Sequence, residues 1–410
     1  MKIVGLITEY NPFHNGHLYH LKQAKAITRA DAVVVVMSGN YVQRGTPAIM
    51  PKHLRAKAAL ASGAAAVIEL PVFYATGSAE YFAAGAVALL DGLGCVDSLC
   101  FGSECGNYEL LYEIAQVIAD EPEAYQTALK AFLKDGLAFP LARQKALEGF
   151  FKDDKKTAVL KEPNNILGLE YIKALYQLKS TMKGYTIRRM TSRYHDTELN
   201  EFCSSASAIR TALSADGFAF SQLQNQLPAI SGQILETAYG IRYPVYSNDF
   251  SLILKYKLLN QTPADLCDFA DVSEELANRI YNRLNDFISF EQFCMILKTR
   301  ELTHSRISRA LLHIILDIRQ QELEVFRQSG YALYARILGF RNDDADVLKL
   351  IKENSRIPMI TRVSSGAKLT GLAGLMFRQD TKASDIYETI VTEKFKNPFI
   401  NEYTQPVLTI

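Results

Sequence analysis

The order of apolar and polar positions predicts strands and helices that alternate over the first hundred residues. Four short apolar runs, several of them rich in β-branched residues, predict buried strands at 2–8, 32–37, 66–70 and 96–101. The amphipathic or Ala-rich stretches between them predict helices at 16–29, from 51, and at 78–90. Strands and helices that alternate at this spacing indicate right-handed crossovers, so we expect an α/β fold with a doubly wound parallel sheet.

After residue 101 the pattern becomes mainly helical. It predicts helices from 107 to about 151 and from 162 to 178, an exposed charged loop at 152–156, a strand at 185–190, and a serine-capped helix from 204. Beyond residue 216 the helical periodicity continues, with short extended pieces expected at 334–340 and 357–363. We therefore predict two domains, 1–215 and 216–410, of which the second is mainly α-helical.

The turn after the first predicted strand is the strongest candidate for a functional site. There His14 and His17 stand on either side of Gly16, at the predicted N-terminus of a helix. Such an N-terminus carries unpaired N–H groups and a positive partial charge, which suit phosphate, and glycine permits a close approach. The alternatives are a zinc pair, disfavoured because no Cys or acidic residue stands at ligand spacing, or ordinary surface histidines.

Other polar residues are expected to meet this turn. The loop that carries Arg44 and the turn at Gly102 also follow strands, and in a parallel sheet those carboxyl ends can face one crevice. Ser205, Ser207 and Arg210 open a helix and form a second candidate anion site. For these three, the alternative is an ordinary serine cap beside a solvated arginine.

Composition and charge exclude several classes of protein. The chain has 410 residues, 48% of them hydrophobic and 22% charged, and a formal net charge of only +1, so any nucleic-acid binding must come from a local patch. Its six cysteines form no Cys-x-x-Cys pair, which indicates reduced thiols, and we see neither a signal peptide nor a run that would span a bilayer. We therefore expect a cytoplasmic protein.

The best local patch lies in the predicted helical domain. Lys298, Arg300, Arg306 and Arg309 gather there, and their charges suit the phosphate backbone of structured RNA. An ordinary solvated helix face is the alternative, and composition alone favours it.

The string from Thr8 to His17, Thr-Glu-Tyr-Asn-Pro-Phe-His-Asn-Gly-His, resembles the His-x-Gly-His signature of the nucleotidyltransferase superfamily. Ala-Ile-Arg at 208–210 resembles the end of the second signature of that superfamily. These two signatures and several further segments resemble the bacterial tRNA(Met) cytidine acetate ligase family. The further segments are 37–40, 43–48, 68–71, 101–104, 163–168, 194–196 and 205–210.

This resemblance implies an ATP-dependent ligase. ATP and acetate would form acetyl-adenylate and pyrophosphate, and the acetyl group would pass to the exocyclic amine of the wobble cytidine of elongator tRNA(Met), giving N(4)-acetylcytidine. Positioning and charge stabilisation do most of the work in attack on an α-phosphate. Mg²⁺ is the expected companion of ATP, and the sequence indicates no obligatory protein partner.

Transferred residue by residue, the resemblance implies catalytic roles for His14 and His17. It implies ATP binding by Ile7, Thr8, Glu9, Tyr10, Asn11, Pro12, Phe13, His14, Asn15, Gly16, His17, His20, Gly102, Asn164, Asn165, Arg189, Ser205, Ser207 and Arg210. For Asn164, Asn165 and Gly102, a helix cap and a strand-ending turn stay open as alternatives.

The resemblance also bears on the remaining basic residues. Only one of the adjacent Arg188 and Arg189 can face the crevice from a strand, and the resemblance selects Arg189. Lys52 or Arg55 could stabilise pyrophosphate. The resemblance favours tRNA binding by Lys298, Arg300, Arg306 and Arg309, although Glu301 stands where a basic residue is expected.

Two other classes of function fit part of the sequence. A small-molecule adenylyltransferase acting on a phosphate acceptor would have little use for a helical domain of this size. A non-catalytic RNA-binding protein built on a retired nucleotidyltransferase domain is disfavoured by the intact His14, Gly16, His17 and Arg210.

Overall fold

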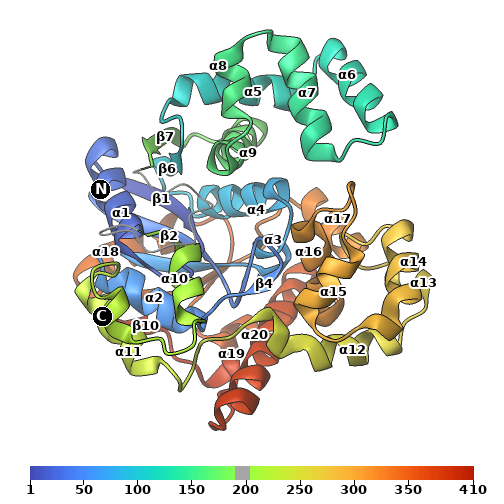
Figure 1. Ribbon diagram of the computed structural model, residues 1–410. Coiled ribbons are helices and arrows are strands. Elements are labelled where there is room, and N and C mark those ends of the chain that lie inside the picture. Colours follow the sequence, from blue (N-terminus) through green and yellow to red (C-terminus); the bar gives the residue numbers. More distant parts are fainter. Residues whose placement is uncertain (190–203) are drawn as a thin grey trace.

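The computed structural model describes residues 1–189 and 204–410, and a mixed β-sheet lies at its centre (Figure 1). The strands of this sheet are β1 (Ile3–Thr8), β2 (Ala32–Ser38), β5 (Ala66–Leu70), β6 (Ser98–Ser103), β7 (Lys183–Arg188), β8 (Ala335–Phe340), β9 (Met359–Ile360) and β10 (Leu408–Thr409). A separate antiparallel pair consists of β3 (Tyr41–Val42) and β4 (Thr46–Pro47). All the strands predicted before residue 190 are confirmed, with ends shifted by up to two residues.

The strand order explains where a ligand can bind. Neighbouring strands run β10-β8-β5-β2-β1-β6-β7, with β9 beside β8, and the five from β5 to β7 are mutually parallel. The chain builds outward from β1 through β2 to β5, then returns to the other side of β1 to add β6 and β7. The order therefore reverses between β1 and β6, and the loops after these two strands diverge into a crevice.

The central strands are apolar because helices cover both faces of the sheet. Val33 and Val35 of β2 pack in one hydrophobic cluster, while Val34 and Val36 pack in another on the opposite face. Alternate residues of a strand point to opposite faces, so a strand covered on both sides needs apolar residues at every position. At Gly5 of β1, an added Cβ would lie 2.7 Å from Cδ1 of Leu90, so glycine lets a covering helix pack closely.

Ten helices precede residue 216 in the described part of the chain. They are α1 (Asn15–Thr28), α2 (Lys52–Ala61), α3 (Val72–Ala75), α4 (Ala79–Gly92), α5 (Tyr108–Asp120), α6 (Glu123–Lys134), α7 (Phe139–Phe151), α8 (Asp154–Val159), α9 (Pro163–Gln177) and α10 (Ala206–Leu213). The run from α5 to α9, residues 108–177, lies between β6 and β7, and we call it the insertion. It forms a helical layer above α4 at the top of Figure 1.

The chain beyond residue 216 is mainly helical, as predicted. Its helices are α11 (Ala229–Ala238), α12 (Ser251–Leu259), α13 (Pro263–Leu266), α14 (Glu274–Arg283), α15 (Phe290–Leu297), α16 (His304–Leu316), α17 (Gln320–Gln328), α18 (Ala345–Asn354), α19 (Val363–Gly366) and α20 (Gly371–Phe395). Short 3₁₀ helices are η1 (Phe220–Leu223), η2 (Ser247–Phe250), η3 (Leu284–Asp286), η4 (Asn342–Asp344) and η5 (Glu402–Thr404).

The expected extended pieces at 334–340 and 357–363 correspond to β8 and β9. Strand β8 pairs antiparallel with β5, and β10 adds to the other edge of β8. The sheet therefore takes strands from both sides of residue 216, and the division into domains 1–215 and 216–410 stays a prediction.

One predicted loop is partly helical. The segment 152–156 was expected to be an exposed loop, but α8 begins at Asp154 within it. The carboxylate of Asp153 accepts hydrogen bonds from the backbone N–H groups of Lys155 and Lys156, so it caps the new helix. A charged run with an acid at its start can therefore open a helix.

Among the helices of residues 1–189 and 204–410, none is both long and apolar enough to cross a membrane. This holds for α20, the 25-residue helix that runs beneath the sheet edge in Figure 1.

We expect Gly94→Ala to destabilise the protein. Gly94 follows α4 with a φ of +70°, and a Cβ there would overlap the backbone carbonyl of Asn354 at the end of α18. Left-handed backbone and overlap with main-chain atoms together cost about 2–4 kcal/mol, so the thermal midpoint should fall. Differential scanning fluorimetry measures the change.

Gly149→Ala is the matched control. Gly149 lies inside α7 with no neighbouring atom within 4 Å of a Cβ, so alanine should stabilise that helix by about 0.5–1 kcal/mol. Equal midpoints for the two variants would contradict the close contact between α4 and α18.

Candidate active site

The crevice between the carboxyl ends of β1 and β6 receives the loop that the sequence singled out. Strand β1 ends at Thr8, and the loop leads directly into α1, whose N-cap is His14. Strand β6 ends at Ser103 on the other side of the reversal. The predicted turn therefore lies where a doubly wound sheet binds its ligand.

Hydrogen bonds fix the two histidine rings. Nδ1 of His14 accepts from the backbone N–H of Gly16 at 3.1 Å, and Nδ1 of His17 accepts from the N–H of His14 at 3.4 Å. The ring centroids lie 3.8 Å apart. Because both Nδ1 atoms are acceptors, each neutral ring carries its proton on Nε2 and can act as an N–H donor. The ring of His17 also has the backbone of Pro12 as a hydrogen-bond partner.

The site keeps these histidines neutral. Burial, and then the positive charges of Arg189 and Arg210, lower the pKa of His14 to about 3. The pKa of His17 lies well below its usual value, chiefly because of burial, and burial with Arg189 lowers that of His20 to about 4. At neutral pH all three rings are uncharged in the free protein.

The residues before His14 hold the loop in place. Tyr10, which has a φ of +48°, is buried with its ring 4.7 Å from that of Phe13 and 4.9 Å from that of His17. The side-chain oxygen of Asn11 accepts from the N–H of Ile49 at 2.8 Å. Tyr10, Asn11 and Phe13, which belong to the predicted ATP-binding segment 7–13, therefore hold the histidine loop in position.

Two bonds tie the start of α1 to the chain beyond residue 216. The backbone N–H of Asn15 donates to the carbonyl of Gln226 at 3.0 Å, and its side-chain amide donates to the carbonyl of Asn225 at 2.8 Å. No motif predicts this contact, since its partners lie far apart in the chain.

The second predicted anion site also reaches this loop. Ser205 caps α10 by accepting from the N–H of Ala208 at 3.1 Å, which confirms the serine cap. Arg210 donates to the carbonyl of Asn11 at 2.7 Å and to the hydroxyl of Ser207 at 3.0 Å. Its positive charge therefore stands beside His14, as the lowered pKa of that ring also indicates.

Arg189 approaches from the other side of the crevice. Its guanidinium donates to the side-chain oxygen of Asn164 at 3.3 Å, and its stem lies 3.4 Å from where Gly102 would carry a Cβ. Its charge lowers the pKa of His14, His17 and His20. Arg188 instead packs against Gly106, so of these two arginines the structure brings Arg189 to the histidines.

Glu104 is a positioning residue that sequence reasoning missed. Its carboxylate accepts from the backbone N–H of Asn165 at 2.8 Å and from the side-chain amide of Asn164 at 2.5 Å, at the start of α9. It thereby orients Asn164 towards Arg189. The only signal in the sequence was its place in the segment 101–104.

Asn165 differs from its neighbour. Its side-chain oxygen accepts from the N–H groups of Glu104 and Cys105, its amide donates to the carbonyl of Val159, and it is only 2% exposed. These partners occupy the side chain, so Asn165 shapes the loop after β6 and is not presented to a ligand.

Lys52 and Arg55, predicted to stabilise pyrophosphate, are fully buried. The Lys52 ammonium lies 2.7 Å from Glu69 and 2.8 Å from Glu402. Arg55 donates to the backbone carbonyls of Glu9, Ser38, Gly39 and Met50. Both cations are already neutralised or hydrogen-bonded inside the protein, so their placement argues against a role at pyrophosphate.

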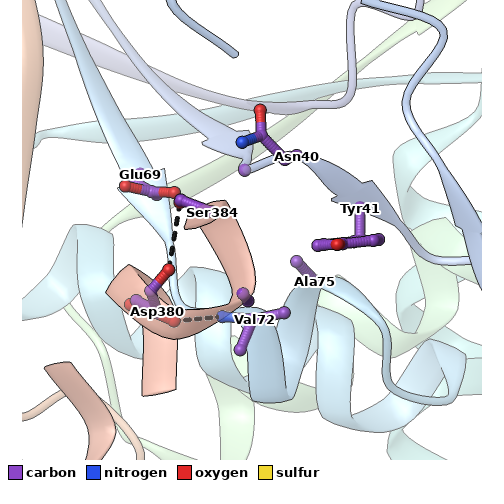
Figure 2. Close-up of a pocket in the computed structure, with 9 residues that line it drawn as sticks. Asn40, Tyr41, Glu69, Val72, Ala75, Asp380 and Ser384 are labelled. Atoms are coloured by element: carbon purple, nitrogen blue, oxygen red, sulfur yellow. Dashed lines mark hydrogen bonds between the residues drawn. The ribbon is translucent and has the colours of Figure 1, made fainter. Parts of the chain in front are cut away.

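A small pocket beside Lys52 is also distinct from the crevice. Figure 2 shows Asn40, Tyr41, Glu69, Asp380 and Ser384 around it, and no histidine lines it. There the carboxylate of Asp380 accepts from the backbone N–H of Val72 at 2.7 Å, and its backbone carbonyl accepts from the hydroxyl of Ser384 at 3.0 Å. Burial and the nearby Glu69 raise the pKa of Asp380 to about 7.

Comparisons with known proteins agree with this geometry. The family model described as HIGH Nucleotidyl Transferase matches residues 1–401. The tRNA(Met) cytidine acetate ligase of Alkaliphilus metalliredigens is 39% identical over 402 residues, which are 95% of each chain. The chain belongs to the tRNA(Met) cytidine acetate ligase family.

Solved structures of this family have the same fold over the full length. The apo crystal structure of Thermotoga maritima TmcAL, form I, is 32% identical and superposes with a TM-score of 0.94, covering all of both chains. The structure of that protein bound with alpha-thio ATP, form II, is 31% identical, has a TM-score of 0.91 and also covers both chains completely.

The basic residues that the family resemblance favoured lie away from the histidine loop. Lys298 and Arg300 are exposed after α15, and Arg306 is partly exposed on α16. Arg309 is paired with Asp271 at 2.9 Å and lies against the backbone at Gly45. Three of the four predicted residues therefore remain accessible, whereas Arg309 holds two parts of the protein together. The segment 194–196 lies outside the described residues.

We expect Arg189→Gln to raise the pKa of His14 and His20. The substitution removes a positive charge that disfavours the imidazolium form, so the pKa of each histidine should rise. Burial lowers both pKa values more than this charge does, and because it remains, both should stay below 6.5. Titration of the ¹³C- and ¹⁵N-labelled imidazoles by NMR measures the shift.

Arg188→Gln is the control, since it removes the same charge one residue earlier. It should leave both histidine titrations unchanged. Similar shifts in the two variants would contradict the assignment of Arg189 to the crevice.

Proposed function

We propose that this chain is a tRNA(Met) cytidine acetate ligase. In the first step an oxygen of acetate attacks the α-phosphorus of ATP, the bond to the bridging oxygen breaks, and pyrophosphate leaves. In the second step the exocyclic amine of the wobble cytidine attacks the acetyl carbonyl, AMP leaves, and the amine loses one proton. The observation that carries this proposal is the pair of neutral Nε2–H donors flanked by Arg189 and Arg210.

The donors and the two arginines have separate tasks in the first step. His14 and His17 donate to the oxygens on which negative charge grows, which needs no proton transfer and no covalent intermediate. Arg210 and Arg189 approach the loop from α10 and from the end of β7, so they can hold phosphates on both sides of the histidines. His20, Asn164 and Gly102 line the remaining side of this nucleotide site.

Mg²⁺ accompanies the triphosphate in this scheme. In the described part of the chain, no three or more His, Cys, Asp or Glu side chains form a group that could hold a metal ion. A hard divalent cation such as Mg²⁺ would bind the phosphate oxygens of ATP.

The remaining partners follow from the family. Elongator tRNA(Met) is the acceptor and acetate the acid, and the exposed Lys298, Arg300 and Arg306 contribute to RNA binding through backbone phosphates. We place the protein in the cytoplasm, where ATP and tRNA are available, and assign it no obligatory protein partner.

Acetate-dependent exchange of labelled pyrophosphate into ATP tests the first step. The natural protein should catalyse exchange with acetate, with or without tRNA. His17→Ala should reduce the exchange rate by about 10²–10⁴-fold, because it removes a donor aimed at growing negative charge. Filter binding should show that its affinity for tRNA(Met) is unchanged.

Arg306→Glu is the complementary variant. Because Arg306 lies on α16, away from the histidine loop, tRNA affinity should fall while exchange continues. Arg309 is unsuitable for this purpose, since its reversal would break the pair with Asp271. No exchange by the natural protein, even with tRNA(Met) present, would refute the ligase assignment and favour a phosphorylated small-molecule acceptor.

A further inference from the structure

Part of the insertion is rich in positive charge, although residues 108–177 as a whole contain nine Lys or Arg and eleven Asp or Glu. Residues 128–161 contain eight Lys or Arg and four Asp or Glu, a formal charge of +4, whereas the whole chain carries only +1. The sequence singled out only the stretch near residue 300, so this concentration of charge has no role in the function described above.

Most of these cations are exposed and uncompensated. The exposed cations are Lys130, Lys134, Lys145, Lys152, Lys155 and Lys161. None of them forms an ion pair with a side chain that the structure describes. By contrast, Lys156 pairs with Glu113 at 2.8 Å and Arg143 pairs with Glu170. These exposed ammonium groups are therefore available to a polyanion.

Aromatic side chains lie among the cations. Phe139 is 52% and Phe150 is 38% exposed on α7, and the Lys145 ammonium stands 5.8 Å from the ring centre of Phe132 on α6. Lysines for phosphates and exposed rings for unpaired bases are the combination with which proteins bind RNA.

The position of the insertion links the nucleotide site to the basic loop after α15. At one end, Lys161 precedes Asn164 by three residues, and Asn164 accepts from Arg189 beside the histidines. At the other end, in the turn between α6 and α7, a Cβ on Gly136 would lie 3.3 Å from the Glu301 carboxylate, next to Lys298 and Arg300. Helix α6 alone is about 18 Å long.

We propose that the outer surface of α6, α7 and α8 is an RNA-binding surface, which holds the sugar-phosphate backbone of the substrate tRNA beside the base being modified. This inference rests on the proposed function, because it takes the same RNA as partner. A long basic surface that starts at the reactive centre can grip the phosphates that flank a base placed in the crevice. The Lys298 and Arg300 loop then extends this surface at its far end.

The test compares two double charge reversals. Lys130→Glu with Lys145→Glu alters exposed positions inside α6 and α7, and Lys349→Glu with Lys352→Glu makes the same change in net charge on α18. We expect the first variant to raise the Kd for tRNA(Met) about tenfold or more and to lower the slope of log K against log salt by about 2. The α18 variant should change the Kd less than twofold and leave the slope unchanged.

Several readouts separate the possible outcomes. Both variants should keep the natural affinity for ATP and the natural thermal midpoint, which shows that the fold and nucleotide site are intact. Equal Kd values and equal salt slopes for the two variants would overturn the RNA-binding surface, while the ligase assignment would stand. If the natural protein itself neither bound nor acetylated tRNA(Met), the proposed function would fail first and the surface with it.

Discussion

The buried guanidinium of Arg55 is the interaction on which the geometry of the crevice depends. It lies at the carboxyl ends of β1 and β2 and donates to the backbone carbonyls of Glu9, Ser38 and Gly39. Burial lowers its pKa to about 10, so it is still charged at neutral pH. A planar group with five N–H donors can hold diverging loops in one arrangement, which an ammonium group cannot do. The loop with His14 starts at Glu9, directly after β1, so its direction is set there.

A second buried network joins the C-terminal part of the chain to the same edge of the sheet. Lys52 and Arg336 contact Glu69 and Glu402, and Asp380 lies beside them, so two cations face three carboxyl groups. Burial with the charge of Glu69 favours the protonated form of Asp380, whose pKa rises to about 7. These contacts explain how strands and helices from beyond residue 216 are held to the nucleotide-binding sheet.

Sequence patterns predicted the features that local chemistry decides. The β-branched run at 32–37 requires a strand covered on both faces, and His14 with Gly16 and His17 requires a helix start that can receive phosphate. The placement of Lys52 and Arg55 could not be predicted, because their partners lie far away in sequence and a charge on a helix usually faces solvent. Asn164 and Asn165 look equivalent in sequence, yet Glu104 and Val159 decide that one faces Arg189 and the other faces the interior. The two-residue strand β10 is too short for any pattern and exists only because β8 offers a free edge.

The charges around the histidines account for the way the site can treat phosphate. In the free protein, burial and then the positive charges of Arg189 and Arg210 keep His14 neutral, so its ring presents an N–H donor. When a triphosphate binds, its negative charges offset those of the arginines, so the arginines lower the pKa of His14 less than in the free protein. In the function we propose, His14 then donates to growing negative charge while it stays neutral, chiefly because it is buried. The two arginines attract the nucleotide, and a neutral imidazole holds the departing pyrophosphate less strongly than a cation would.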